Sequence, residues 1–194
     1  MDISIYTRDI SVDLISKIKN RFKEFHMDID FHSGFKFDEK RDNGFLPIQL
    51  KVHKGYSTKY DEIDYEIISG FELFFTDYDY NEDLKNIREY ANSAKRKSFF
   101  LRLFGQSKVL ETMPISFVAD AELDPLLQDC NKVLLLNFKS WNKSELRVSL
   151  FFAAILAELT NGVVYDPHNG RYLSGEQALN VFPLEIEEYE ESFS

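Results

Sequence analysis

The segment most suited to chemistry in this sequence is 77–83 (DYDYNED), in which oxygen-bearing side chains alternate with other residues. Its first positions imitate a calcium-binding loop, whose carboxylate and amide oxygens are the ligands that Ca²⁺ prefers. Such a loop needs glycine at its sixth position and a bidentate glutamate at its twelfth, where this chain has Glu82 and Arg88. We therefore interpret the segment as a strand end that continues into an acidic helix start, and we predict no metal there.

The other reactive side chains are scattered along the chain. Cys130 is the single cysteine, so no intrachain disulfide can form, and a free cysteine is usually a small buried core residue. Asp166 and His168 could act as a general acid and base, but the surrounding sequence DPHNG is typical of a turn. The four histidines lack the spacing of metal ligands: His26, His32, His53 and His168. The motifs of nucleotide-binding loops, serine hydrolases and zinc proteases are absent, so the sequence predicts no catalytic residue, cofactor or metal.

The composition indicates one globular domain. The chain has 194 residues, of which 44% are hydrophobic, with 8 Gly and 5 Pro. These values suit one sizeable core and exclude collagen-like and generally disordered classes. The N-terminal sequence MDISIYTRDI lacks the basic and apolar regions of a signal peptide, and the longest uncharged apolar run, 148–157, is too short to span a bilayer. We expect a cytoplasmic protein that does not enter a membrane.

Apolar periodicity predicts strands and helices in mixed order. Strands are expected at 3–5, 27–31, 46–52, 65–75, 98–104 and 132–141, with a hairpin around the turn at 166–170. Helices are expected after Ser11, over 81–96 with Asn81 as cap, over 144–160 from Ser144, and over 174–179, where Ser174 and Gln177 have capping-box spacing. The segment 123–130 is either a short helix or a loop.

This mixture predicts an α+β fold, a single domain over residues 1–184 in which helices cover a mostly antiparallel sheet. The helix at 144–160 is apolar nearly all round, so we expect it to be buried. Its expected partner is the sheet face that carries Ile67, Phe71 and Leu73.

The last residues, 185–194, alternate Glu with apolar side chains. We interpret them as an acidic tail that is either an edge strand or disordered. Replacing Glu187 or Glu190 in such a tail is expected to change stability little, because exposed charges away from caps and networks contribute little.

Charge is distributed unevenly around a net value of -10. Residues 61–83 contain nine acidic side chains and no Lys or Arg, whereas residues 84–110 contain seven basic side chains and one glutamate. An acidic block repels phosphate backbones and attracts a basic partner. Nucleic acid is therefore an unfavourable ligand, although the basic run 95–108 is a possible local exception.

Tyrosines border the acidic block, and aromatic side chains beside charge are typical of protein interfaces, although plain strand propensity explains them equally well. The interface hypothesis predicts a basic protein partner. The candidate contact residues are Asp61, Glu62, Asp64, Glu66, Glu72, Asp77, Tyr78, Asp79, Tyr80, Glu82 and Asp83.

The segment 151–179 (FFAAILAELTNGVVYDPHNGRYLSGEQAL) resembles a region found in small bacterial proteins. It combines an apolar helix, a Thr-x-Gly stop, a short strand leading into Asp-Pro-x-x-Gly, and a closing helix. In size, acidity and pattern of elements the chain is similar to the immunity proteins of bacterial toxin systems, including contact-dependent inhibition. The resemblance implies a cytoplasmic inhibitor that binds a toxin domain, and it implies no particular binding residue.

Two other classes of function stay open. A structural or adaptor protein would use the same acidic face without inhibiting anything. An enzyme would need a site assembled by spatial convergence, in a deep pocket with titratable groups of displaced pKa. A toxin gene directly beside the gene for this chain would favour the immunity hypothesis.

Overall fold

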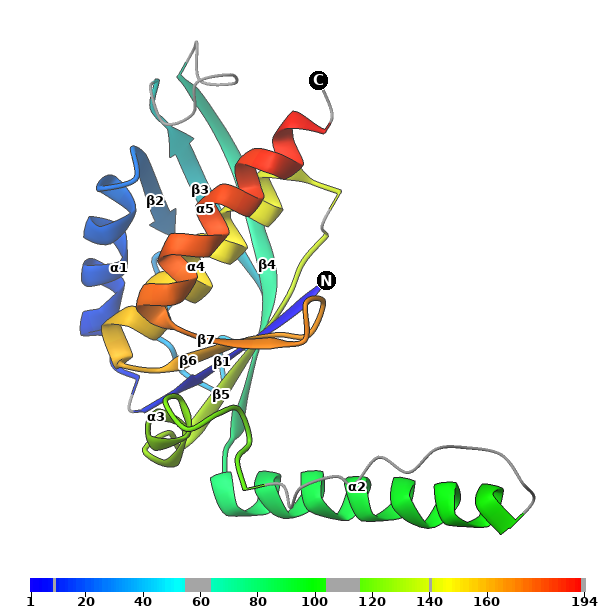
Figure 1. Cartoon of the computed structure of the whole chain (residues 1–194). Helices are drawn as coiled ribbons and strands as arrows, with labels where there is room; N and C mark the ends of the chain where they lie inside the picture. Colours follow the sequence, from blue (N-terminus) through cyan, green and yellow to red (C-terminus); the bar gives the residue numbers. More distant parts are fainter. Residues whose placement is uncertain (9, 55–63, 104–115, 140, 193–194) are drawn as a thin grey trace.

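The computed structural model describes the chain except for residues 9, 55–63, 104–115, 140 and 193–194. The described residues form these strands: β1 (Asp2–Thr7), β2 (Met27–Phe31), β3 (Gly44–Val52), β4 (Tyr65–Asp77), β5 (Lys132–Asn137), β6 (Val163–Asp166) and β7 (Arg171–Ser174). They make one antiparallel sheet in the order β2-β3-β4-β5-β1-β6-β7 (Figure 1).

Three helices cover one face of this sheet: α1 (Asp13–Lys23), α4 (Lys143–Thr160) and α5 (Gly175–Glu191). Two further helices lie apart from them: α2 (Tyr80–Leu103) and α3 (Asp124–Gln128). α4 contacts β4 and β1 and also both neighbouring helices, whereas α2 extends away from the sheet (Figure 1). The predicted α+β class and the single compact domain are confirmed.

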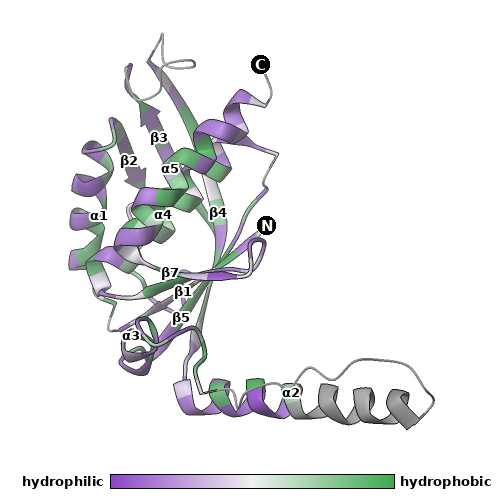
Figure 2. Cartoon of the chain, viewed as in Figure 1, coloured by the Kyte–Doolittle hydropathy of each residue, from purple (hydrophilic) through white to green (hydrophobic). Residues whose placement is uncertain are grey.

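α4 is the central element of the core, as predicted. Much of α4 is coloured as hydrophobic in Figure 2, whereas much of α1 is coloured as hydrophilic. Leu156 is fully buried, and the Phe152 ring lies 4.9 Å from the ring of Phe71 on β4. The helix begins one residue earlier than expected, because the cap is Asn142 and not Ser144: the Asn142 side chain accepts hydrogen bonds from two backbone N–H groups of the first turn. It ends at Asn161 in the left-handed conformation.

Several sequence predictions are wrong where local patterns were ambiguous. α1 begins at Asp13 after Val12, which makes no side-chain cap, so Ser11 does not cap it. Residues 98–103 are not a strand but continue α2, because each residue added to an existing helix gains a hydrogen bond and a short apolar run fits either structure; residue 104 lies outside the described part. The segment 123–130 contains the short helix α3.

The prediction that Ile67 belongs to the buried face of β4 is also wrong. Ile67 is exposed, whereas Phe71 and Leu73 are buried as expected. β5 pairs with residues 72–77 of β4. Ile67 therefore lies beyond the part of β4 that has a strand on both sides.

The prediction of a tail at 185–194 is wrong for 185–191, which belong to α5. The predicted capping box of Ser174 and Gln177 is present at the start of this helix, but the helix continues through Pro183. Phe182 and Ile186 are buried on its inner side. Burial of this stripe outweighs the loss of the backbone donor at the proline.

A buried ion pair holds the end of α5 against α4. The side chains of Arg147 and Glu190 are 1% and 4% exposed, and Arg147 Nη2 lies 2.7 Å from Oε1 and 2.6 Å from Oε2 of Glu190. Arg147 Nη1 also donates to the Tyr65 hydroxyl on β4 (3.2 Å). The expectation that Glu190 is an exposed tail charge is therefore wrong, whereas Glu187 is exposed.

The start of α5 crosses α4 at Gly175. A Cβ atom there would lie 2.1 Å from the backbone N of Glu158 and 2.3 Å from its Cα. We expect Gly175→Ala to lower the free energy of unfolding by about 1–3 kcal/mol, because the backbones of α4 and α5 would have to separate. Urea unfolding measures this, with Gly34→Ala as control: its Cβ would have its nearest neighbour at 3.4 Å, so a change within about 0.5 kcal/mol is expected. Equal effects of the two substitutions would contradict the close crossing.

Candidate functional site

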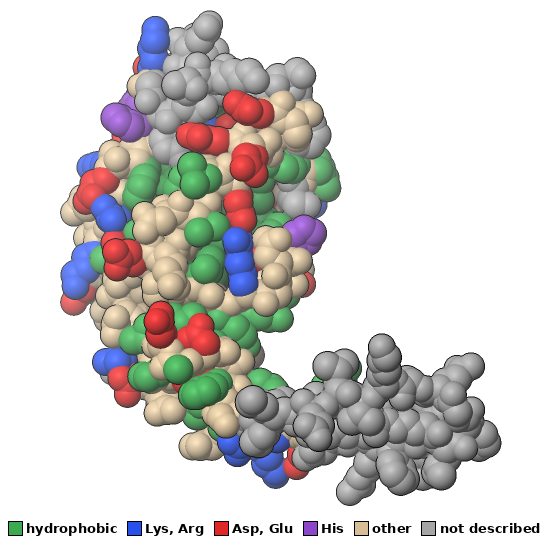
Figure 3. All heavy atoms as spheres, viewed as in Figure 1, with side chains coloured by type: hydrophobic (Ala, Val, Ile, Leu, Met, Phe, Trp, Pro, Cys, Tyr) green, Lys and Arg blue, Asp and Glu red, His purple; other side chains and the backbone are tan. Residues whose placement is uncertain are grey.

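The two faces of the sheet differ in what covers them. α1, α4 and α5 cover the inner face. Acidic, basic and apolar side chains are interspersed on this side of the molecule (Figure 3). The opposite face of β3, β4 and β5 carries side chains that alternate with the core residues of these strands. We call this surface the open face, and define it by Phe45, Pro47, Gln49, Lys51, Glu66, Ile68, Glu72, Phe74, Leu135 and Asn137.

The centre of the open face is apolar and exposed. Phe45 is 62% exposed, Ile68 76% and Phe74 38%. Phe74 is in register with Leu135 on β5, and Pro47 is in register with Gly70. Gly70 has a φ of 151°, and a Cβ atom there would lie 3.0 Å from the Phe45 ring, so the aromatic ring lies against a bare backbone. Large apolar side chains exposed together on a rigid strand surface are typical of an interaction site.

Two residues of the acidic block lie on the open face with these apolar side chains. Glu72 is exposed and in register with Phe45, and Glu66 is exposed and in register with Lys51. The Glu66 carboxylate accepts a hydrogen bond from Gln49. Asp64, just before β4, accepts a hydrogen bond from the backbone N of Lys54 (2.8 Å). Asp61 and Glu62 lie outside the described residues.

The other end of the block builds the junction between β4 and α2. Asp77 lies 2.6 Å from Lys132 Nζ. Asp79 accepts hydrogen bonds from the backbone N–H groups of Asn81 (2.8 Å) and Glu82 (3.2 Å), so Asp79 and not Asn81 supplies the cap. Glu82 is exposed. The interpretation of 77–83 as a strand end leading into a helix is confirmed.

Tyr78, Tyr80 and Asp83 have partners inside the molecule. The Tyr80 hydroxyl donates to Asp124 (2.5 Å), a buried carboxylate that also accepts from two backbone N–H groups. The Tyr78 ring meets the Tyr6 ring edge-on at 4.7 Å. Burial raises the pKa of Asp83, whose side chain is only partly exposed. The contacts of Tyr78 and Tyr80 stabilise the packing at the start of α2.

The described residues of the acidic block are therefore spread along β4 and the start of α2 and do not form one patch. Glu66 and Asp77 are eleven residues apart on β4, which is about 37 Å at ~3.4 Å per strand residue. Its two ends cannot both contact one small area of a partner. On the open face, Glu72 lies between Ile68 and Phe74 along β4 and opposite Phe45 on β3, so a carboxylate lies among the apolar side chains.

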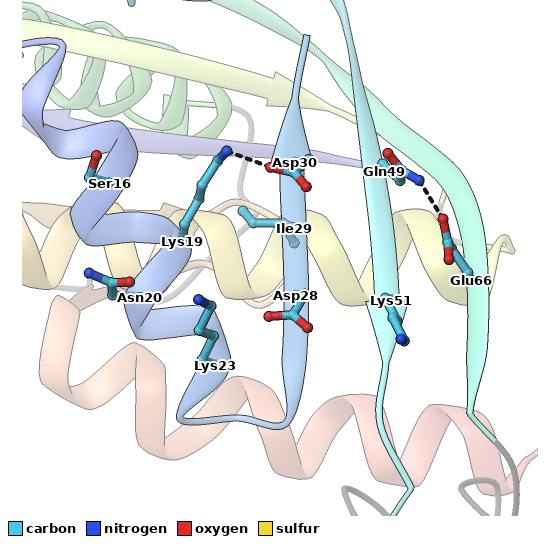
Figure 4. A pocket seen from close by; sticks show the side chains of 10 residues that line it. All are labelled: Ser16, Lys19, Asn20, Lys23, Asp28, Ile29, Asp30, Gln49, Lys51 and Glu66. Carbon is cyan, nitrogen blue, oxygen red and sulfur yellow. Dashed lines mark hydrogen bonds and ion pairs between the residues drawn. The ribbon is translucent and has the colours of Figure 1, made fainter. Parts of the chain in front are cut away.

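A polar pocket of about 430 Å³ lies beside the open face, between α1 and strands β2 to β4 (Figure 4). Lys19 on α1 lies 2.5 Å from Asp30 on β2, and Gln49 and Glu66 from the open face line the opposite wall. Lys23, Asp28 and Lys51 also line it, so charges of both signs face the pocket.

The other residues considered for chemistry have structural surroundings. The buried Asp166 accepts hydrogen bonds from the backbone N of His168 (3.1 Å) and from Arg171 Nε (3.1 Å), which confirms the turn interpretation. Cys130 is buried, and burial raises the pKa of its thiol to about 11. His53 Nε2 lies 2.6 Å from an Asp28 oxygen. Among the described residues, no three His, Cys, Asp or Glu side chains are grouped as metal ligands.

Three exposed apolar residues of the open face were not predicted as site residues from the sequence: Phe45, Ile68 and Phe74. A signal was available, because β4 has large apolar residues on both of its faces: Phe71 and Leu73 on the core face, and Ile68 and Phe74 on the other. A strand with one face exposed to solvent usually has polar residues on that face.

Within the described part of the chain, no helix has the length and apolarity needed to cross a bilayer. Comparison of the chain with protein-family models, with curated proteins and with solved structures found no match.

Proposed function

We propose that this chain is a non-catalytic, cytoplasmic binding protein that neutralises a cognate toxin domain by direct contact, in the manner of an immunity protein. One observation carries the binding proposal: three large apolar side chains, Phe45, Ile68 and Phe74, are exposed together on the open face. The immunity class rests on the resemblance of 151–179 and on the acidity of the chain.

The chemistry of the open face supports a partner of a particular kind. An apolar centre surrounded by polar groups is the usual anatomy of a protein interface, where the centre provides most of the affinity. Glu66 and Glu72, which lie on the open face with these apolar side chains, favour a partner that presents Lys or Arg beside its apolar patch. A net charge of -10 favours approach of a basic protein.

The proposal is tested with the protein encoded directly beside the gene for this chain. That protein is expected to arrest growth when produced alone and to be harmless when this chain is co-produced. Ile68→Lys is expected to weaken the complex at least tenfold, about 1.4 kcal/mol, because it places a cation against a basic border and removes apolar contact. Leu184→Lys is the control, since Leu184 is also apolar and exposed but lies on α5.

The measured outcomes separate the three classes of function. Neutralisation that survives Ile68→Lys would contradict the open face as the binding site. Binding without any growth effect would favour an adaptor. Turnover of the partner or of a small molecule by the purified chain would favour an enzyme.

The dependence of binding on ionic strength tests the proposed attraction between the acidic chain and a basic partner. The association rate is expected to fall as salt rises, because screening shortens the reach of the carboxylates to about 8 Å at 0.15 M. Stopped-flow mixing between low and high salt measures this, and a rate that does not change would contradict a basic partner.

A further inference from the structure

The long strand β4 has a neighbouring strand on both sides along only part of its length. β3 pairs with residues 65–73 of β4 on one side, whereas β5 pairs with residues 72–77 on the other side. Residues 65–71 therefore have one edge along which no described strand pairs, and we call it the free edge. The backbone groups along such an edge are a template for another extended chain.

Alternate residues of a strand direct their backbone groups to opposite sides, so the parity of β4 shows which groups face the free edge. The backbone N of Phe75 donates to the side chain of Asn43, just before β3 (2.9 Å), so odd-numbered residues of β4 face β3. The pairing with β3 is continuous over 65–73. Glu66 and Ile68 therefore direct their N–H and C=O groups to the free edge, and no described residue is hydrogen-bonded to these four groups.

β5 does not cover the free edge, because the chain turns away after the strand ends. Lys139 is the next residue whose backbone would face β4, opposite Gly70 in the same register. Its N–H donates instead to the side chain of Glu145 (3.0 Å), and its C=O accepts from the backbone N of Asn142 (3.1 Å). Asn142 caps α4, so the capping turn uses the groups that would have continued the pairing.

The side chains beside the free edge do not protect it. Ile67 and Ile68 are 42% and 76% exposed and lie on opposite faces of β4. The outer strand β2 differs, because its Asp30 forms an ion pair with Lys19, and charged side chains are a usual means by which edge strands resist pairing. The free edge thus combines accessible backbone groups with apolar side chains on both faces, which suits an added strand.

Charge indicates which kind of protein supplies that strand. The open face beside the free edge carries two carboxylates, Glu66 and Glu72, and one cation, Lys51. A second copy of the chain would bring a net charge of -10 against the same charge, which opposes pairing of two free edges. A segment of a basic protein has no such repulsion.

We propose that the partner adds an extended segment to the free edge of β4, with Lys or Arg beside Glu66 and an apolar side chain beside Ile68. Backbone hydrogen bonds then contribute affinity, and the side chains on the open face select the sequence. This inference rests on the proposed function for the identity of the partner, and it deepens that function by stating how the partner binds.

A synthetic peptide tests the free edge without the partner. The probe is acetyl-KVTVKVK-amide, and its control has Glu in place of each Lys. At saturation the basic peptide is expected to slow hydrogen exchange of the Glu66 and Ile68 amides at least tenfold, whereas the Ile67 amide, which faces β3, changes little. The acidic peptide is expected to bind at least tenfold more weakly. Equal affinities for the two peptides, or protection that maps elsewhere, would overturn the proposal.

Two variants at one position separate backbone pairing from side-chain contact. Ile68→Pro removes the N–H that faces the free edge and leaves the pairing with β3 in place. Ile68→Ala shortens the side chain and keeps the N–H. Alanine is expected to weaken binding of the basic peptide about threefold, and proline at least tenfold beyond alanine. Equal binding by the two folded variants, verified by their amide spectra, would also overturn the proposal.

These results are distinguishable from a failure of the proposed function. If the peptide does not bind at the free edge but the chain still neutralises the neighbouring gene product through the open face, the inference fails and the proposed function stands. Protection of the Glu66 and Ile68 amides in the protein alone, rising with its concentration, would show that a second copy occupies the free edge and would overturn the proposal.

Discussion

Replacing Glu190 with alanine is expected to lower the free energy of unfolding by about 3–5 kcal/mol, because it leaves the guanidinium of Arg147 buried without its carboxylate. The pair is bidentate and nearly inaccessible to solvent, so water cannot replace the lost partner. Urea unfolding followed by circular dichroism measures the change. An effect below about 1 kcal/mol would show that the end of α5 is not docked as described.

Two matched variants make this result specific. Glu187→Ala changes the same residue type three positions earlier on α5, at an exposed site, and is expected to stay within about 0.5 kcal/mol of the parent. The double variant Arg147→Met, Glu190→Leu is expected to recover most of the stability, since apolar side chains of similar volume often replace a buried ion pair without loss. If the double variant stays as unstable as Glu190→Ala, the hydrogen bond from Arg147 to Tyr65, or the packing around it, contributes more to stability than the ion pair does.

Truncating Leu156 to alanine is expected to lower the free energy of unfolding by about 2–5 kcal/mol, through lost burial and a residual cavity in α4. Leu156 is fully buried in the middle of the core cluster. Leu184→Ala makes the same chemical change on the exposed side of α5 and is expected to have little effect. If both variants unfold at the parental urea concentration, α4 is not the central helix.

Elements with strong local signals were predictable from sequence. The run at 144–160 is apolar nearly all round, which favours a buried helix. Ser174 and Gln177 specify a helix start through their own hydrogen bonds. The alternation around Phe71 and Leu73 likewise specifies one buried face of β4. Each of these patterns is complete within a short stretch of sequence, so it can be interpreted without knowing which distant residues pack against it.

The continuation of α5 through Pro183 depended on tertiary structure. A proline and a run of glutamates predict the end of a helix when only neighbours in sequence are considered. Contact with α4 supplies burial for Phe182 and Ile186 and a cation for Glu190. The partner of Glu190 is 43 residues away in the chain, and local periodicity contains no information about it.

The candidate site depended on the tertiary structure for the same reason. Nine acids within 61–83 indicate an acidic surface, but the extended backbone of β4 spreads the described ones along a strand, and Asp77 and Asp79 bind groups of the chain itself. Phe45 and Phe74 come together on the open face only because β3 and β4 pair in one register. The sequence by itself determined the fold class, the central helix and the sign of the net charge, because these follow from composition and short-range periodicity. Which apolar and charged groups share a surface was decided by strand pairing and helix packing, because those bring together residues whose separation in sequence exceeds any local pattern.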